Sequence, residues 1–147
     1  MNDTTFFPGV MDFDLAFEHK YARVWSNPIR KIVICELLTD YVPIEDFKEV
    51  FAEIGDLVKE GDFTKFIFDK RALRAFHQPT MEWYFIHWKK EMLGYGLKTH
   101  RKILPAEKWF EKMVQIAKAQ FITQYPDNII DQLDIAYCDT LEAAILS

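Results

Sequence analysis

The hydrophobic pattern changes period along the chain, and each change predicts an element. Residues 19–26 and 30–38 are rich in alternating or β-branched apolar side chains on either side of Asn27-Pro28, which predicts an antiparallel hairpin. Residues 42–61 carry apolar side chains at three- and four-residue steps, the spacing of an amphipathic helix. Three further strands are predicted at Lys65–Asp69, Thr99–Leu104 and Asp134–Cys138.

Helical segments are predicted between these strands. A second helix begins at Pro79-Thr80 and ends near residues 94–96, a third runs from Pro105 to about Gln124, and a short one closes the chain with Asp139 as its N-cap. This order predicts an α/β fold with a mixed sheet of about five strands, right-handed crossovers and helices mainly on one face. Residues 1–17 form an irregular apolar segment, expected to pack on the domain or on a second copy of it.

Composition narrows the class of protein. A chain of 147 residues fits a single domain over 1–147, and its 50% hydrophobic content argues against disorder. The net charge of −5 is spread along the chain, which predicts a soluble acidic protein with no nucleic-acid footprint. No signal peptide is recognisable, and no apolar run approaches the roughly 18 residues of a membrane span. We therefore expect a cytoplasmic location and no integral membrane segment.

Few residues carry recognisable chemistry. Cys35 and Cys138 lie in strand-like segments, where reduced thiols are expected, and the pair His87 and Glu91 offers too few ligands for a zinc site. The sequence contains no glycine-rich phosphate loop and no evident nucleophile. We predict no metal, no cofactor and no enzymatic activity. Catalysis would require Asp69 and His77, or a similar pair, to converge in a pocket that excludes water.

The predicted order of elements resembles the SpoIIAA-like, or STAS, family of anti-sigma-factor antagonists and their small bacterial relatives. The likeness covers residues 18–146 and depends on the hairpin, the helix VPIEDFKEVFAEIGDLV, the strand FIFD and the ending DIAYCDTLEAAIL. It implies a bacterial STAS-like domain that regulates by protein–protein interaction. In antagonists of this family, the strand that matches Phe66–Asp69 is followed by a phosphorylated Ser or Thr. This chain instead has Asp69-Lys70-Arg71, with no hydroxyl before Thr80.

The segment after the FIFD strand is the first candidate site. Asp69 ends the strand at the edge where open α/β sheets place ligands, and it is a candidate base, binding carboxylate or turn cap. Lys70, Arg71, Arg74 and His77 precede a helix N-terminus, which favours anions. The segment is therefore either a phosphate or acidic-peptide site, or a solvated basic loop paired with nearby carboxylates.

The second helix is the other candidate. It carries more aromatic surface than one packed face needs, and Trp83, Tyr84 and Trp88 are candidate anchors for a partner. Alternatively, the apolar N-terminal segment covers Trp83 and Ile86 within the monomer. The basic residues Lys89, Lys90, Lys98, His100, Arg101 and Lys102 are expected to form a solvated face, with an acidic partner or a membrane surface as the alternative.

Two functions follow from these sites. The first is a non-enzymatic regulatory module that docks a protein partner or a second copy through the second helix, without the usual phosphorylatable Ser. The alternative is a protein that binds a small anionic or apolar ligand between the Asp69–Thr80 loop and the second helix.

Overall fold

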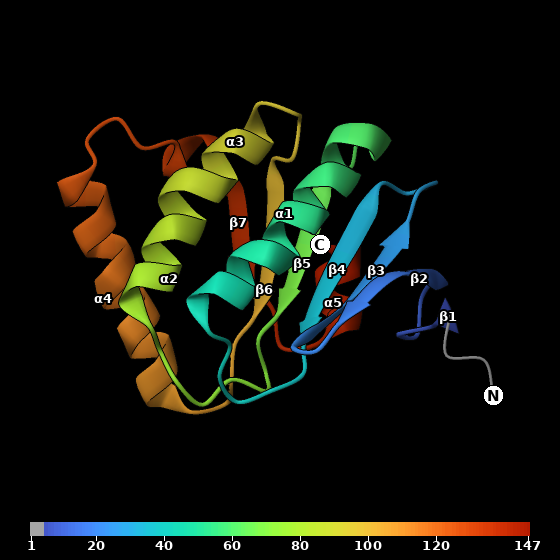
Figure 1. Ribbon diagram of the computed structural model, residues 1–147, viewed down its shortest axis with the longest axis horizontal. Coiled ribbons are helices and arrows are strands. Elements are labelled where there is room, and N and C mark those ends of the chain that lie inside the picture. Colours follow the sequence, from blue (N-terminus) through green and yellow to red (C-terminus); the bar gives the residue numbers. More distant parts are fainter. Residues whose placement is uncertain (1–4) are drawn as a thin grey trace.

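A single mixed sheet organises the chain, and the computed structural model describes it over residues 5–147 (Figure 1). Within that range the sheet has seven strands in the order β1-β2-β3-β4-β5-β6-β7, so each strand pairs with its neighbour in sequence. Pairing is antiparallel from β1 to β4 and parallel from β4 to β7. The strands are β1 (Thr5–Phe6), β2 (Phe13–His19), β3 (Ala22–Asn27), β4 (Ile32–Leu37), β5 (Lys65–Asp69), β6 (Thr99–Ile103) and β7 (Asp134–Tyr137).

Helices cover both faces of the sheet unequally. One face carries the long helices and the other carries only the last short helix, α5 (Figure 1). The helices are α1 (Ile44–Gly61), α2 (Gln78–Glu82), the π-helical turn η1 (Trp83–Trp88), α3 (Lys89–Leu93), α4 (Lys108–Gln124), the 3-10 turn η2 (Ile130–Gln132) and α5 (Leu141–Leu146). The predicted α/β class with a mixed sheet is confirmed.

The sheet is larger than the expected five strands because part of the N-terminal segment joins it. Residues 1–4 of that segment lie outside the described residues, but β1 and β2 belong to it and extend the hairpin. The register of β2 shifts between Leu15 and Phe17, so Leu15 packs with the α5 face and Phe17 with the face of the long helices. This irregularity breaks the period of two, which explains why the segment reads as irregular in the sequence.

Each face of the sheet has its own apolar core. Phe51 of α1, Phe66 and Phe68 of β5, and Tyr84 and Trp88 of η1 are buried together under the long helices. On the other face, residues such as Phe13, Trp25, Ile34, Ile67 and Ile145 pack under α5. The N-cap of α5 is Thr140 and not Asp139, because the Thr140 hydroxyl accepts the Ala143 N–H at 3.0 Å.

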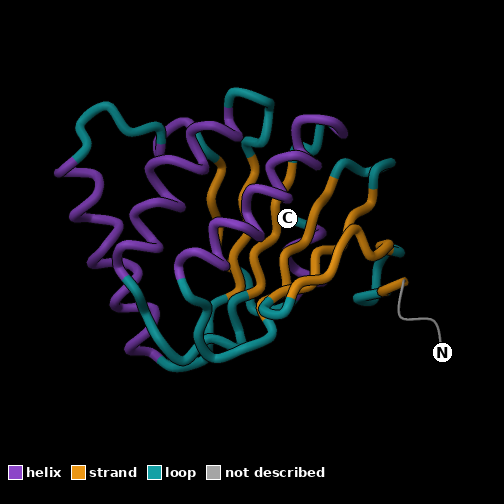
Figure 2. Tube along the Cα trace, in the orientation of Figure 1, coloured by secondary structure: helices purple, strands orange, loops and turns teal. Residues whose placement is uncertain are grey.

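The connections that follow β4, β5 and β6 meet at one edge of the sheet. These strands are parallel, so their carboxyl ends lie together, and their loops run side by side at the bottom of the molecule (Figure 2). Ligands of open α/β sheets bind at such an edge.

Candidate ligand-binding site

A narrow pocket opens at this edge, between the start of α1, the β5–α2 loop and the start of α4. Its apolar walls come from Leu37, Val42, Phe47, Phe68, Phe76 and Phe110, and its polar groups include Lys70, His77 and Thr80. We call it the β5 pocket. Its cavity volume is about 30 Å³. The pocket therefore suits a slim, mainly apolar molecule.

Lys70 reaches the pocket because it continues the alternation of β5. Phe66 and Phe68 point to the face of the long helices, and Lys70 follows at the next step of two. Its side chain is fully buried, with Nζ 3.9 Å from the Met81 sulfur and 5.0 Å from the centre of the Phe68 ring. The strand period thus places an amine in an apolar core.

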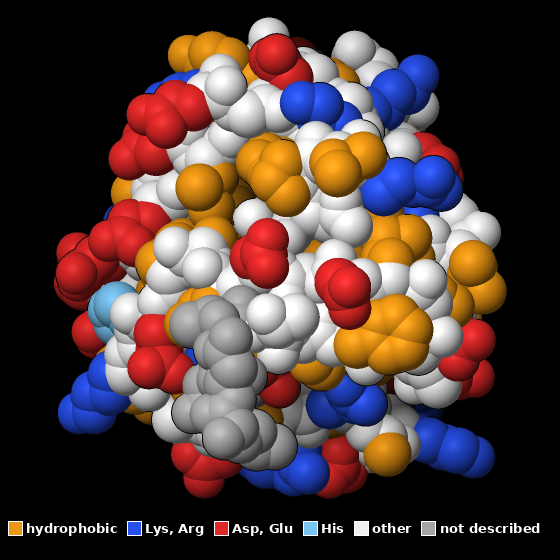
Figure 3. Space-filling model, turned by 90° about the vertical axis from the view of Figure 1, so that its right-hand side faces the viewer, with side chains coloured by type: hydrophobic (Ala, Val, Ile, Leu, Met, Phe, Trp, Pro, Cys, Tyr) orange, Lys and Arg blue, Asp and Glu red, His pale blue; other side chains and the backbone are white. Residues whose placement is uncertain are grey.

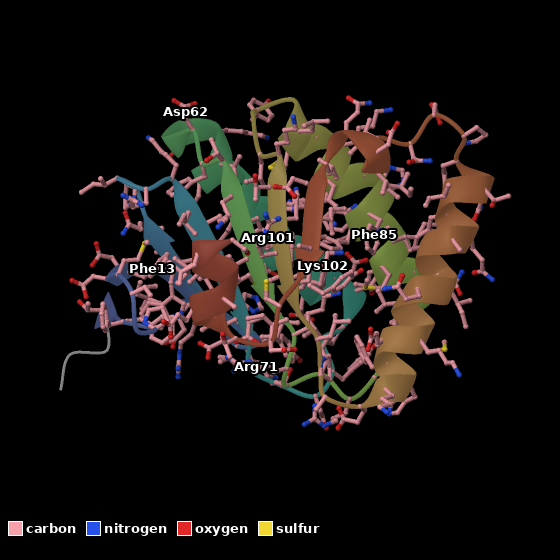
Figure 4. The ribbon with its side chains drawn as sticks, turned by 180° about the vertical axis from the view of Figure 1, so that it is seen from behind. Phe13, Asp62, Arg71, Phe85, Arg101 and Lys102 are labelled. Carbon is pink, nitrogen blue, oxygen red and sulfur yellow. The ribbon has the colours of Figure 1, made fainter. Side chains whose placement is uncertain are left out.

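β6 brings a second amine to the same face. His100 and Lys102 are fully buried beneath the long helices, whereas Arg101 between them points to the α5 face, where it contacts Ser147. Nζ of Lys102 lies 3.8 Å from the centre of the Phe85 ring and 5.2 Å from that of Tyr84. Figure 4 shows Lys102 on β6 with Phe85 on the neighbouring helix.

The π-helical turn η1 supplies the third amine. The Lys89 N–H donates to the Tyr84 carbonyl, five residues back, so Lys89 lies directly above Tyr84 and faces inward. Its Nζ is 4.8 Å from the centre of the Tyr84 ring and 4.2 Å from that of Phe85. Nζ of Lys70 is 5.8 Å from the same Tyr84 ring. We call Lys70, Lys89 and Lys102 the amine cluster.

No carboxylate offsets the amine cluster within residues 5–147. The three lysines form no ion pair there, the Tyr84 hydroxyl has no hydrogen-bond partner, and the amines of Lys89 and Lys102 interact with each other rather than with a carboxylate. Burial without a counter-ion disfavours the charged form of an amine. It lowers the pKa of Lys70 to about 7 and the pKa values of Lys89 and Lys102 well below their usual range.

The rest of the cluster responds to the same burial. Burial and the nearby amines of Lys89 and Lys102 lower the pKa of His100, so its imidazole is neutral, and burial raises the pKa of Tyr84. Arg101 shows the contrast: it is 7% exposed, and it donates to the Asp134 carboxylate at 3.0 Å and to the Ser147 carbonyl at 3.1 Å. The α5 face thus pairs its buried cation, whereas the face of the long helices does not.

The predicted loop residues divide into two groups. Asp69 and Arg71 pair with each other through two hydrogen bonds of 2.9 and 2.7 Å, and Arg74 pairs with Glu107 at 3.2 Å. Their charges are therefore already offset, as the solvated-loop alternative expects. The Asp69–Arg71 bond also raises the pKa of Arg71. Lys70 and His77 instead line the β5 pocket.

Asp69 and His77 do not pair with each other. Asp69 is bound by Arg71, whereas the Nδ1 atom of His77 lies 2.7 Å from the Thr80 hydroxyl, and both His77 and Thr80 line the pocket. The polar group next to His77 is therefore a hydroxyl, with the Lys70 amine in the same pocket.

The aromatic residues of the second helix do not form an exposed face. Tyr84 and Trp88 are 0% and 3% exposed, and the Trp88 indole donates to the Phe51 carbonyl at 2.8 Å. Trp83 is half-buried and packs edge-on against Phe47 of α1, with ring centres 6.1 Å apart. The expectation that Tyr84 and Trp88 are surface anchors is wrong, because α1 and the sheet bury them.

The N-terminal segment does not cover this helix either. Most of its described apolar residues pack on the other core, where the rings of Phe6 and Trp25 lie 5.1 Å apart, whereas Ala16 and Phe17 pack at the border of the core under the long helices. Figure 3 faces the edge of the sheet nearest this segment, where acidic and basic side chains separate the apolar ones. The exposed apolar side chains Trp109, Met113 and Ile116 instead lie at helical spacing on α4.

One group of possible metal ligands occurs in the described chain, at His19, Asp46 and Glu49. Nδ1 of His19 accepts the Tyr21 N–H at 3.3 Å, which places the ring proton on Nε2, 3.8 Å from Glu49. A protonated nitrogen has no lone pair for a metal. At 3.8 Å this contact is an ion pair when the imidazole is protonated, rather than a ligand set.

Sequence reasoning placed the basic residues of β6 and Lys89 on a solvated face, and this is wrong for Lys89, His100, Arg101 and Lys102, which are all buried. A signal was present for β6, because a central strand of a parallel sheet is usually covered by helices on both faces and so has no solvent-facing side. For Lys89 no such signal existed, since its inward position depends on the π-helical turn.

A scan against protein-family models found no matching family, and searches of curated proteins and of solved structures found no significant match. The resemblance to STAS proteins therefore stays a prediction. No helix among the described residues is long and apolar enough to cross a membrane.

Proposed function

We propose that this protein binds a small, slim and mainly apolar ligand in the β5 pocket, with one polar group of the ligand facing Lys70. The observation that carries the proposal is a buried amine without a carboxylate partner in the wall of an apolar pocket, at the ligand-binding edge of a parallel sheet. Buried, perturbed amines in clefts are typical of functional sites, because they destabilise a fold that has no use for them.

A carboxylate ligand would change the charge of Lys70. Its negative group favours the ammonium form, so binding takes up a proton when the free amine is neutral. Because the pKa of Lys70 is lowered to about 7, the affinity for a carboxylate falls as pH rises above that value. A neutral ligand of the same length has no such dependence.

Hexanoate and 1-hexanol test the proposal as a pair of probes. We expect both to shift the NMR signal of the Met81 methyl group, which lines the pocket, and we expect hexanoate to bind up to about tenfold more weakly at pH 8.5 than at pH 7.5. Ala75→Leu narrows the pocket and should abolish the shifts, whereas Ala72→Leu, in the same loop but outside the pocket, should preserve them. Absence of binding by either probe, or binding that survives Ala75→Leu, would contradict the proposal.

Protein docking, the regulatory function that the STAS resemblance implies, stays a second candidate. What favours it is the exposed apolar stripe of Trp109, Met113 and Ile116 on α4, which are 47%, 41% and 51% exposed. A contact with a partner or a second copy would use α4 rather than the second helix.

A further inference from the structure

The buried amine of Lys70 differs chemically from the amines of the lysines that face solvent. It ends in a dry cluster of Met81, Phe68 and Tyr84 side chains, and no carboxylate of residues 5–147 forms an ion pair with it. The amines of Lys89 and Lys102 lie on the same Tyr84 ring, so protonation of one disfavours protonation of the others.

An unprotonated amine has a free lone pair. Burial lowers the pKa of Lys70 to about 7, so a large fraction of this side chain is neutral near pH 7, whereas an ordinary lysine is almost entirely protonated. Removal from water and proximity to other cations are the two ways in which lysine nucleophiles are activated. The first, removal from water, occurs at Lys70.

We propose that Lys70 forms a reversible imine with small aldehydes or ketones that enter the β5 pocket. This inference rests on the proposed ligand binding and names the class of ligand. The walls accept a short alkyl group, and the carbonyl carbon would meet the amine at the base of the pocket. Met81 lies 3.9 Å from this amine and lines the same pocket, and rotation of its flexible side chain gives the carbonyl access.

The reaction balances without an oxidant or a reductant. The Nζ lone pair forms a C–N bond while the π electrons of the carbonyl move to oxygen, and a proton passes from nitrogen to that oxygen to give a carbinolamine. The C–O bond then breaks as nitrogen forms the C=N bond, and the leaving hydroxyl departs with a proton as water. Amine and carbonyl give imine and water.

The pocket also holds groups that can move these protons. His77 and Thr80 line it and share a hydrogen bond of 2.7 Å between Nδ1 and Oγ1. An imidazole can donate a proton to the carbinolamine oxygen and take it back. Cys35 and Cys138 do not line the pocket, so no thiol competes there for the carbonyl.

Reductive trapping with propanal tests this inference on the natural chain. The protein is incubated with propanal and cyanoborohydride at pH 7.5, and the propylated lysines are located and timed by peptide mass spectrometry. We expect Lys70 to be modified about tenfold faster than the exposed Lys90 and Lys98, because more of its amine is neutral. Equal or slower modification of Lys70 would overturn the imine proposal.

Variants distinguish a failure of the imine proposal from a failure of the proposed ligand binding. Ala75→Leu should slow the trapping at Lys70 and leave Lys90 unaffected, whereas Ala72→Leu should change neither, and Met81→Ala should speed trapping at Lys70. Binding of hexanoate without fast trapping would reject the imine alone, and loss of both would reject the ligand site as well. Fast trapping that Ala75→Leu does not slow would reject the pocket as the route, and with it the inference.

Discussion

Replacing Lys102 by methionine is expected to raise the free energy of unfolding by about 1–3 kcal/mol. The two side chains have similar length and shape, so the apolar contacts with Phe85 and Tyr84 are kept while a buried amine without a carboxylate partner is removed. Urea denaturation at pH 7 measures the change. Lys98→Met, an exposed position just before β6, is the matched control and should change the free energy by less than about 0.5 kcal/mol.

The buried amines also predict the direction in which stability changes with pH. An amine whose pKa is lowered by folding binds fewer protons in the folded state than in the unfolded state, between its lowered pKa and about 10.4. Stability of the natural chain therefore rises with pH in that window, by at most about 1.4 kcal/mol per pH unit for each amine. For Lys70 the window begins near pH 7.

Lys102→Met should make this rise shallower, because one of the responsible groups is gone. The pKa values of Lys89 and His100 also change, because Lys102 contributes to both. An unchanged slope together with reduced stability would mean that Lys102 is charged and paired in the folded protein, contrary to the structure.

Phe51→Ala should have the largest destabilising effect, a loss of about 3–5 kcal/mol. Phe51 is fully buried, and its ring centre lies 4.2 Å from that of Phe47, 4.9 Å from Trp88 and 5.4 Å from Tyr84. Its truncation leaves a cavity where α1, β5 and η1 meet. The change is read from urea denaturation followed by tryptophan fluorescence.

Phe7→Ala is the control for this experiment. Phe7 is 59% exposed, so its truncation should cost less than about 0.5 kcal/mol. A loss below about 1 kcal/mol for Phe51→Ala would show that α1 and η1 are not packed as described.

Much of the fold is contained in hydrophobic periodicity. The period of α1 and the apolar β4 and β5 predict their elements to within a few residues, because burial of one helical stripe and of central strands leaves a regular pattern. β2 is not predictable in this way. Its register shift sends Leu15 and Phe17, which are two residues apart, to opposite faces, whereas a regular strand would place both on the same face.

The candidate site was predictable in part. The sequence places Lys70 and His77 in the loop after β5, where the pocket opens. It does not indicate that Lys89 and Lys102 are buried, because charged residues are ordinarily solvated and the π-helical turn that directs Lys89 inward has no sequence pattern of its own. Aromatic abundance in η1 reflects the packing around these amines rather than an exposed surface.

The central claim is that Lys70 is a buried amine with a pKa of about 7 in the wall of a ligand pocket. A pH titration of the lysine Cε and Nζ signals by NMR between pH 5 and 11 tests it most directly, with Lys70→Met used to assign the Lys70 signal. We expect Lys70 to titrate with a midpoint of about 7, and the exposed lysines to titrate near 10.4. A Lys70 midpoint near 10.4 would show that the amine is solvated or paired, and would contradict both the ligand site and the imine chemistry.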